Sequence, residues 1–397
     1  MENIRVLELY SGIGGMHYAL TESGVGAEVV AAVDVNTTAN EIYKHNFPNT
    51  PLHPKTIEGM TLDDFNKLTF DMILMSPPCQ PFTRIGLQGD ISDPRTKSFL
   101  YILDLLPRLS KLPRFILLEN VKGFETSSAR ESMVKTLIEC GYNYQELLVS
   151  PTCLGMPNSR LRYFLIAKMN CSTLWRQNPI QLISSFKQIH EGFPLPAEED
   201  VSGRSFPVSH SSASTTCPEE ERRETQAEDA GVLYKLERIQ DAERKSRQNR
   251  DESVRQIGDY LENHGGEEME QYLLSHKTLL RYALLMDIVR PTCRRSVCFT
   301  KGYGHYVEGT GSVLQSCMET DMESAFRSLE LLSDEEKLQQ LSRLKLRYFT
   351  PREIANLMGF PKHFTFPKNI STKQQYRVLG NSLNVHVVAR LIQLLVS

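Results

Sequence analysis

The chain has 397 residues, of which 40% are hydrophobic and 23% charged, so we expect a folded protein with one large domain and a smaller one. Its net charge of −3 excludes a protein that coats nucleic acid through bulk positive charge. The phosphates of a nucleic-acid partner would have to bind a local cluster of basic residues on the surface. The start of the chain lacks a secretory pattern, and no apolar run approaches the roughly 18 residues that span a bilayer. We therefore expect an intracellular protein without a membrane partner, in the cytoplasm with the nucleus as an additional compartment. We also expect a monomer.

Apolar runs that predict strands alternate with helical patterns through the first half of the chain. The strand-like runs are 4–10, 28–33, 70–75 and 115–118, and the helical patterns include 38–46, 98–109 and 130–140. Such alternation implies βαβ units, hence an α/β fold in which helices cover both faces of a parallel sheet.

The middle of the chain is poor in apolar residues and rich in Ser, Glu and Arg, above all near 196–255. We interpret this stretch as a disordered charged insert. The alternative is a charged helix, at 236–247, that meets a substrate. The segment 382–396 is apolar at helical spacing, which predicts a C-terminal helix that docks on the first domain.

A glycine turn follows the first predicted strand, and an acidic residue follows the second. Gly14 and Gly15 belong to the turn, and Asp34 lies about twenty residues beyond it, where a carboxylate accepts hydrogen bonds from ribose. This pattern suits NAD, FAD and S-adenosylmethionine alike, and a glycine turn without any ligand also explains it.

Cys79 follows a buried strand and two prolines, Pro77 and Pro78. The prolines fix the backbone and would present the side chain rigidly at the edge where open parallel sheets bind ligands. A thiolate is a strong nucleophile, so Cys79 is our candidate for covalent catalysis. A lone cysteine elsewhere is more often a buried small hydrophobe.

Three further charged side chains are candidates for the same edge. Glu119 ends a predicted strand and could share a proton with a base, or else serve as a helix N-cap or salt-bridge partner. Arg160 and Arg162 are two residues apart, which on a strand puts both guanidiniums on one face, where they could grip an anion or a carbonyl. Exposed surface arginines are the usual alternative.

Taken together, these motifs resemble the cytosine-5 methyltransferase family. The ordered signatures are ELYSGIGG at 8–15, PPCQ at 77–80, ENV at 119–121, RLR at 160–162, TPRE at 350–353, GFP at 359–361 and GNS at 380–382. The sequence CFTKGYG at 298–304 looks like that of the compact, tRNA-directed branch of the family.

The resemblance implies a Rossmann-like methyltransferase sheet with a smaller target-recognition domain. Residues 1–185, completed by 371–397, would form the catalytic domain, and residues 186–370 the target-recognition domain. The implied methyl donor is S-adenosyl-L-methionine. Its site would be lined by Ile13, Gly14, Gly15, Asp34, Ile57, Glu58, Ser76, Asn381 and Ser382.

The resemblance also implies roles for the candidate side chains. Cys79 would attack carbon 6 of cytosine, Glu119 would bind the ring nitrogen and exocyclic amine, and Arg160 and Arg162 would orient the base or a phosphate. The residues Cys298, Phe299 and Thr300 would contact the substrate.

The implied substrate is tRNA, with cytosine 38 in the anticodon loop of tRNA-Asp as the target and weak or no activity on DNA. A base in an unpaired loop leaves its stack at lower cost than one in a duplex. The alternatives are a duplex-DNA methyltransferase with the same residues, an NAD-dependent oxidoreductase, which leaves Cys79 without a role, and an inactive nucleic-acid binder. We expect no metal, because Cys293 and Cys298 lack the spacing of a zinc-binding pair.

Overall fold

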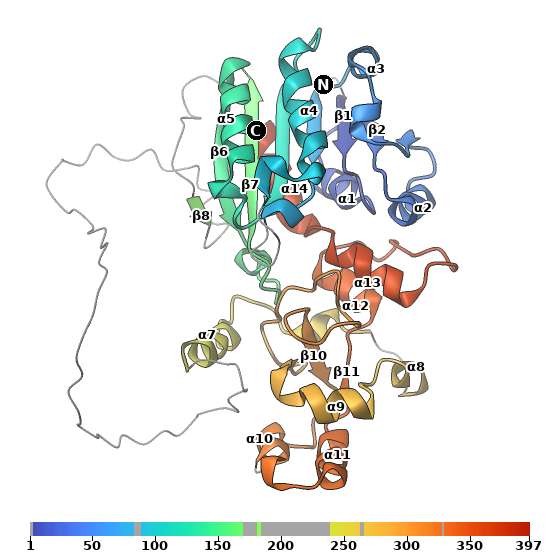
Figure 1. The fold of residues 1–397 in the computed structure, drawn as a ribbon, viewed down its shortest axis with the longest axis vertical. Helices are drawn as coiled ribbons and strands as arrows, with labels where there is room; N and C mark the ends of the chain where they lie inside the picture. Colours follow the sequence, from blue (N-terminus) through green and yellow to red (C-terminus); the bar gives the residue numbers. More distant parts are fainter. Residues whose placement is uncertain (1–2, 83–88, 170–180, 184–238, 263–265, 328) are drawn as a thin grey trace, which may run out of the picture.

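The protein is described from a computed structural model, which covers residues 3–82, 89–169, 181–183, 239–262, 266–327 and 329–397. These residues form an upper body around a large sheet and a lower body with a small sheet, and the chain returns to the upper body at its C-terminus (Figure 1). The two-part arrangement agrees with the expected architecture, while the exact domain boundaries stay predictions.

Eight strands among the described residues form the large sheet, in the order β3-β2-β1-β4-β5-β7-β6-β8. They are β1 (Ile4–Leu9), β2 (Ala27–Val33), β3 (Leu52–His53), β4 (Met72–Met75), β5 (Phe115–Val121), β6 (Tyr142–Val149), β7 (Arg162–Met169) and β8 (Gln181–Ile183). Strands β1 to β5 pair in parallel, whereas β7 runs antiparallel to both of its neighbours, β5 and β6. Strand β6 also pairs in parallel with β8, so β7 is the one antiparallel strand among the described strands, and the expected, mainly parallel sheet is confirmed.

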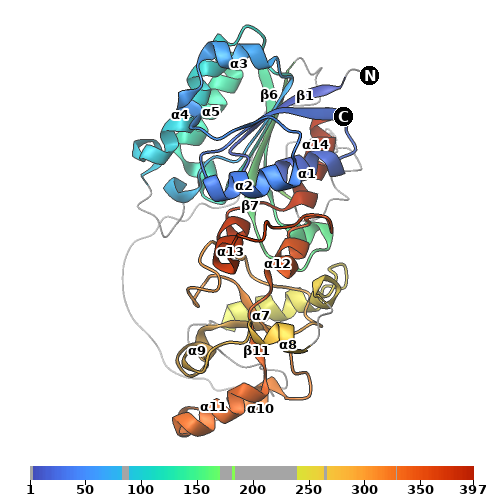
Figure 2. The same cartoon turned by 90° about the vertical axis from the view of Figure 1, so that its right-hand side faces the viewer.

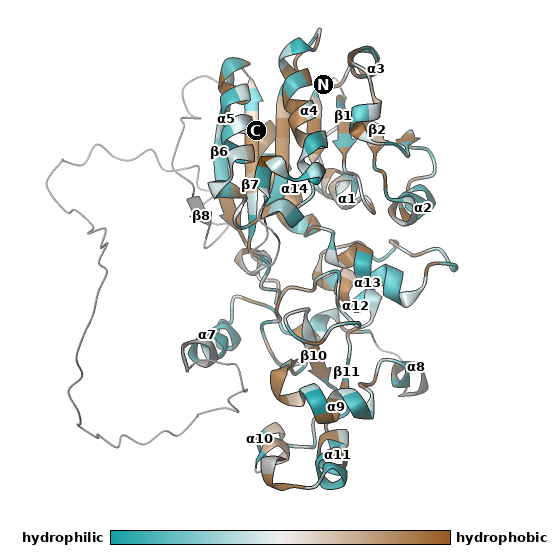
Figure 3. Ribbon diagram, viewed as in Figure 1, coloured by the Kyte–Doolittle hydropathy of each residue, from teal (hydrophilic) through white to brown (hydrophobic). Residues whose placement is uncertain are grey.

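Helices cover both faces of this sheet because side chains alternate along each strand. In β1, Ile4 and Val6 pack with α1 (Gly15–Glu22), α2 (Thr37–Asn46) and α14 (Val385–Val396). Leu7 and Leu9 pack on the opposite face with α3 (Leu62–Leu68), α4 (Lys97–Leu105) and α5 (Ser128–Glu139). Figure 3 shows the strands mostly apolar and the helices with polar outer faces.

The predicted helices and strands match these elements, with one difference that bears on the site. The run 115–118 continues as β5 through Val121, so Glu119 lies within the strand rather than after it. Strand pairing with β7 extends β5, since Glu119 pairs with Phe164 and Val121 pairs with Arg162. The backbone at Glu119 is thereby fixed by pairing with β7, because the pairing of β5 with β4 ends at Leu118.

The lower body is built on a small sheet in the order β11-β10-β9. Its strands are β9 (Asp287–Val289), β10 (Ser312–Gln315) and β11 (Leu346–Arg347). Around it lie α8 (Gly266–Glu270), α9 (His276–Tyr282), α10 (Met322–Phe326) and α11 (Asp334–Arg343). Figure 2 shows α10 and α11 at the end farthest from the large sheet.

The charged middle stretch lies partly outside the described residues, from 184 to 238. Its end forms a charged helix, α7 (Ile239–Asn249), as the alternative interpretation expected, whereas contact of this helix with a substrate stays a prediction. The Lys245 ammonium lies 2.9 Å from Asp287 Oδ1, and Asp287 also binds Arg295 at 2.7 Å. This ion-pair cluster fixes α7 to the small sheet.

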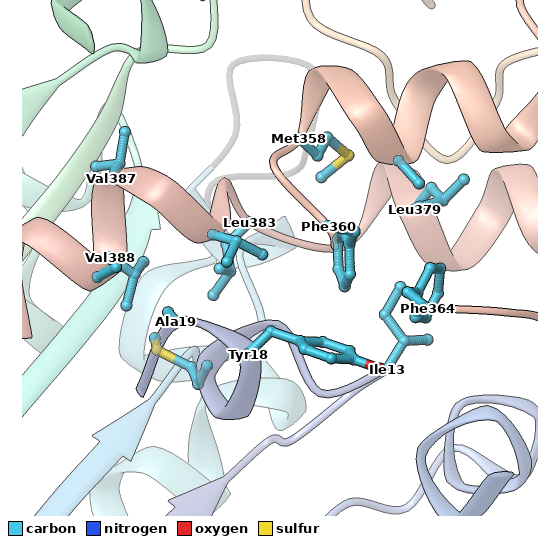
Figure 4. Packing of buried hydrophobic residues seen from close by; sticks show 14 of the residues in the cluster. Ile13, Tyr18, Ala19, Met358, Phe360, Phe364, Leu379, Leu383, Val387 and Val388 are labelled. Carbon is cyan, nitrogen blue, oxygen red and sulfur yellow. The ribbon is translucent and has the colours of Figure 1, made fainter. Parts of the chain in front are cut away.

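The C-terminal segment returns to the large sheet through α12 (Pro351–Leu357), α13 (Thr372–Gly380) and α14. Figure 4 shows Leu383 and Val388 pointing toward α1, and both are buried, so the expected docking of a C-terminal helix is confirmed. By length and composition alone the stretch Thr372–Val396 could cross a membrane, but 61% of its most apolar 18-residue window is buried inside the protein. Its apolar character is that of a core helix.

Candidate active site

The Cys79 thiol lies in the loop that follows β4, at the carboxyl end of the strand. The backbone carbonyl of Cys79 accepts a hydrogen bond of 3.0 Å from the Phe82 N–H. This bond closes a 3₁₀ turn directly after the proline pair. The side chain is half-buried. Burial raises the pKa of Cys79, the nearby Glu119 carboxylate raises it further, and the Arg162 guanidinium opposes both. The geometry presents the thiol, but the free site favours its protonated form.

Glu119 projects from β5, the strand next to β4, and its side chain is 11% exposed. Its Oε1 lies 3.5 Å from Nε of Arg162. Burial raises the pKa of the Glu119 carboxyl, and the Arg162 and Arg160 guanidiniums lower it. A buried carboxyl with a raised pKa is suited to hold or share a proton with a bound base.

Arg160 and Arg162 both reach a third side chain, the Cys298 thiol of the lower body. Nη1 of Arg160 donates to Cys298 Sγ at 3.1 Å, and Nη2 of Arg162 donates to the same sulfur at 3.4 Å. Burial would raise the pKa of Cys298, but the two guanidiniums outweigh it and lower that pKa. The sequence-based expectation that both arginines lie on one strand is wrong in detail, because Arg160 precedes β7.

Arg160 joins three separate parts of the chain at this point. Its Nη1 donates to the Phe299 carbonyl at 3.2 Å, and its Nη2 donates to the carbonyls of Ser382 and, at 3.5 Å, Gly380. It is 4% exposed, so the usual alternative of a surface arginine does not apply. Arg160 therefore ties the catalytic sheet to the lower body and to the C-terminal segment.

The glycine turn after β1 makes a close approach to the C-terminal segment. Gly14 has a φ of 86°, which favours glycine, and a Cβ built on Gly15 would lie 3.1 Å from Ser382 Oγ. Asp34, after β2, accepts backbone N–H bonds of 2.8 Å from Gly12 on one oxygen and Asn36 on the other. These bonds fix the carboxylate beside the turn, at the carboxyl edge of the sheet.

Ser11, which was not among the residues expected at the cofactor site, lies in the same glycine turn. Its Oγ is buried without a hydrogen-bond partner among the described residues, which leaves a polar atom for a bound group. The backbone cradle, the fixed acid and this hydroxyl fit a nucleoside-containing cofactor. The structure places Ile13 and Ile57 in the core, Glu58 and Asn381 at the surface, and Ser76 and Ser382 half-buried.

Two features of this region were missed by sequence reasoning. Glu8 is fully buried in β1, and Tyr43 donates a 2.8 Å hydrogen bond to its Oε2. Burial raises the pKa of Glu8 to about 8. The second feature is Gly380, where an added Cβ would lie 2.2 Å from the Lys301 backbone nitrogen. An acid inside an apolar strand run was the available signal for Glu8, whereas no local signal marks the contact at Gly380.

The three residues predicted to contact the substrate differ in their surroundings and in their exposure. Cys298 faces the two arginines, Phe299 is buried with 2% exposure, and Thr300 is half-exposed. Phe299 packs edge-on against Tyr303 and Phe349 within the hydrophobic core, so it supports the segment rather than contacting a substrate. Within the described ranges, no three His, Cys, Asp or Glu side chains gather as a metal site.

The family model described as "C-5 cytosine-specific DNA methylase" matches residues 4–397. The Homo sapiens protein named tRNA (cytosine(38)-C(5))-methyltransferase is 58% identical over 395 residues, which cover 100% of both chains. A Dictyostelium discoideum protein named DNA (cytosine-5)-methyltransferase is 38% identical over 402 residues, covering 100% of this chain and 95% of the other.

A solved structure agrees with both relatives. The S. pombe Dnmt2 methyltransferase superposes with a TM-score of 0.72 at 35% identity, and the match covers 100% of this chain and 98% of the other. Sequence and fold are thus similar over the whole described length. The chain belongs to the C-5 cytosine-specific DNA methylase family.

Proposed function

We propose that this protein transfers a methyl group from S-adenosylmethionine to carbon 5 of a cytosine in tRNA. The observation that carries the proposal is the full-length identity of 58% to a relative named tRNA (cytosine(38)-C(5))-methyltransferase. The cluster of Cys79, Glu119, Arg160 and Arg162 supplies the side chains that such a reaction needs. We further propose cytosine 38 of tRNA-Asp as the target, in a cytoplasmic, monomeric enzyme.

The mechanism that we propose begins with the Cys79 thiolate. Its sulfur would form a bond to carbon 6 of the cytosine, which breaks the aromaticity of the ring and makes carbon 5 nucleophilic. Glu119 would hold the ring nitrogen and the exocyclic amine and stabilise the charge that develops there. Once carbon 5 carries the transferred methyl group, loss of the carbon-5 proton and expulsion of the Cys79 thiolate would restore the aromatic ring.

The residues that would hold S-adenosylmethionine are those of the glycine turn and its neighbours. When bound, the cofactor supplies an electrophilic methyl group. Gly14 and Gly15 have no Cβ, which lets the turn lie close against Phe47 and Ser382. Asp34 would offer a fixed carboxylate to ribose hydroxyls, and Ser382 would close the site from the C-terminal segment.

An RNA substrate is supported by the surface beside the arginine cluster. Arg244 and Arg247 on α7 and Arg250 directly after it are exposed, and Gln248 of this helix donates a 3.4 Å hydrogen bond to Ser159 Oγ, next to Arg160. Such a basic helix face suits phosphate contacts although the whole chain carries a slight negative charge. The Dictyostelium relative's name favours duplex DNA as the second candidate substrate.

Methylation assays on both polymers test the proposal. The purified protein is incubated with labelled S-adenosylmethionine and either unmodified tRNA-Asp transcript or cytosine-rich duplex DNA, and bisulfite sequencing locates the methyl group. We expect one methylated cytosine in the anticodon loop, abolished by Cys79→Ala and retained by Cys140→Ala, a second half-buried cysteine that serves as the control. Methylation of DNA alone would overturn the choice of substrate.

A further inference from the structure

Tyr306 is an exposed aromatic side chain on the lower body. Its exposed fraction is 64%, and among the described residues it is the only aromatic one in the set of large exposed hydrophobic side chains. The other phenylalanines and tyrosines in these ranges are buried or half-buried. An exposed ring of this size contributes little to the core and offers an aromatic face to a binding partner.

The ring is exposed but not free to take any orientation. The carbonyl of Gly302 accepts hydrogen bonds from the N–H groups of His305, at 3.0 Å, and Tyr306, at 2.9 Å. A Cβ built on Gly302 would lie 3.1 Å from Cδ2 of Tyr306, and the His305 ring contacts the tyrosine edge-on with centroids 4.6 Å apart. One part of the ring thus rests on the loop while the rest faces outward.

The loop that carries Tyr306 is closed and anchored. The Thr300 N–H donates to the Thr310 carbonyl at 2.8 Å, and the Thr310 hydroxyl donates to the Tyr306 carbonyl at 2.7 Å. Beneath it, Tyr303 is buried and packs edge-on against Tyr376 of α13. Little ordering entropy would therefore be lost if a ligand contacted the exposed ring.

This loop begins at the arginine cluster of the candidate active site. Cys298, whose sulfur binds both arginines, lies two residues before Thr300, where the loop closes. Lys301, which is exposed, follows immediately and packs its backbone against Gly380. Figure 2 shows this orange part of the chain next to α13, between the two bodies. An exposed ring on the same short loop is placed to meet a polymer that enters the site.

We propose that Tyr306 is a stacking platform for an unpaired nucleobase that flanks the target cytosine of an RNA loop. This inference rests on the proposed function and adds how the protein holds the RNA loop. A target base must leave its stack before it reaches Cys79, and its neighbours then lose a stacking partner. Aromatic side chains replace such partners in single-stranded RNA recognition, and Lys301 would meet the adjacent phosphate.

Binding to a synthetic anticodon stem-loop of tRNA-Asp tests this role. Dissociation constants are measured for the wild type, Tyr306→Ala and Tyr306→Phe, each with the intact RNA and with versions abasic at one nucleotide flanking the target. Tyr306→Ala should weaken binding of intact RNA about tenfold, and Tyr306→Phe, which keeps the ring, should change it less than about twofold. One abasic substitution should weaken wild-type binding similarly and leave Tyr306→Ala almost unaffected.

The matched control is Leu331→Ala, because Leu331 is 86% exposed and lies in the turn before α11, at the far end of the lower body. This variant should bind RNA like the wild type. Equal binding by Tyr306→Ala and the wild type, equal losses in Tyr306→Ala and Tyr306→Phe, or equal abasic effects in Tyr306→Ala and the wild type would each overturn the stacking role.

Methylation by the wild type, measured in the same series, separates the two proposals. If the wild type methylates the stem-loop and Tyr306→Ala binds it equally well, only the stacking role is wrong. If the wild type methylates duplex DNA and not the stem-loop, both proposals are wrong.

Discussion

Replacing Glu119 by glutamine should slow methyl transfer while making the Cys79 thiol more reactive. The amide keeps the size of the side chain but removes the negative charge that raises the pKa of Cys79. Arg162 lies 3.5 Å from Glu119 and keeps its 3.4 Å contact with Cys298, so the site should remain assembled. Loss of a preorganised group that stabilises developing charge typically lowers kcat about 10²- to 10³-fold, or roughly 2.7–4 kcal/mol.

Two assays on the same Glu119→Gln preparation separate these effects. Single-turnover methylation of the tRNA-Asp transcript should fall by that factor, whereas alkylation of Cys79 by iodoacetamide at neutral pH should be as fast as in the wild type or faster. Cys79→Ala identifies the alkylated residue. A parallel fall in methylation and alkylation would refute the reasoning, because Glu119 would then act through the thiol rather than on the base.

Two more predictions concern pH and stability. Because burial holds the pKa of Cys79 above its ordinary value, the thiolate fraction is small at neutral pH, and kcat/KM should rise about tenfold per pH unit until that raised pKa is reached. A profile that is flat between pH 7 and 9 would contradict this. Glu353 is fully buried and pairs with Arg347 at 2.7 Å, so Glu353→Gln should lower the free energy of unfolding by about 3–5 kcal/mol, since it leaves Arg347 buried without its counter-charge. Denaturant titration measures the loss, and an unchanged midpoint would exclude a structural role for the pair.

The sequence predicted β1, β2, β4 and β5, four of the eight described strands of the large sheet, because these strands are buried on both faces and contain continuous apolar runs. The end of β5 was misplaced, since Glu119 is polar, and a charged residue in a single sequence looks like the end of a strand. Only pairing with β7, more than 40 positions later in the chain, extends the strand through Val121. The antiparallel direction of β7 also has no local signal.

The sequence predicted which side chains form the candidate site but not the contacts that hold them together. Cys79, Glu119 and the arginines follow from the motifs, whereas the contact between Arg160 and Cys298 joins residues 138 positions apart. Its formation depends on how the lower body folds back on the sheet. The TPRE signature has a local explanation that the sequence alone did not provide: Thr350 caps α12, and Glu353 completes a capping box while it binds Arg347.

The most direct test of the proposed chemistry is to trap Cys79 on its substrate. A tRNA-Asp stem-loop with 5-fluorocytosine at the target position is incubated with the protein and S-adenosylmethionine. Because fluorine replaces the proton that must leave carbon 5, the ring cannot expel the thiolate. We expect a covalent complex that survives denaturing electrophoresis, maps to Cys79 by mass spectrometry and is absent in Cys79→Ala. Efficient methylation of the unmodified stem-loop without any such complex would contradict covalent catalysis by Cys79.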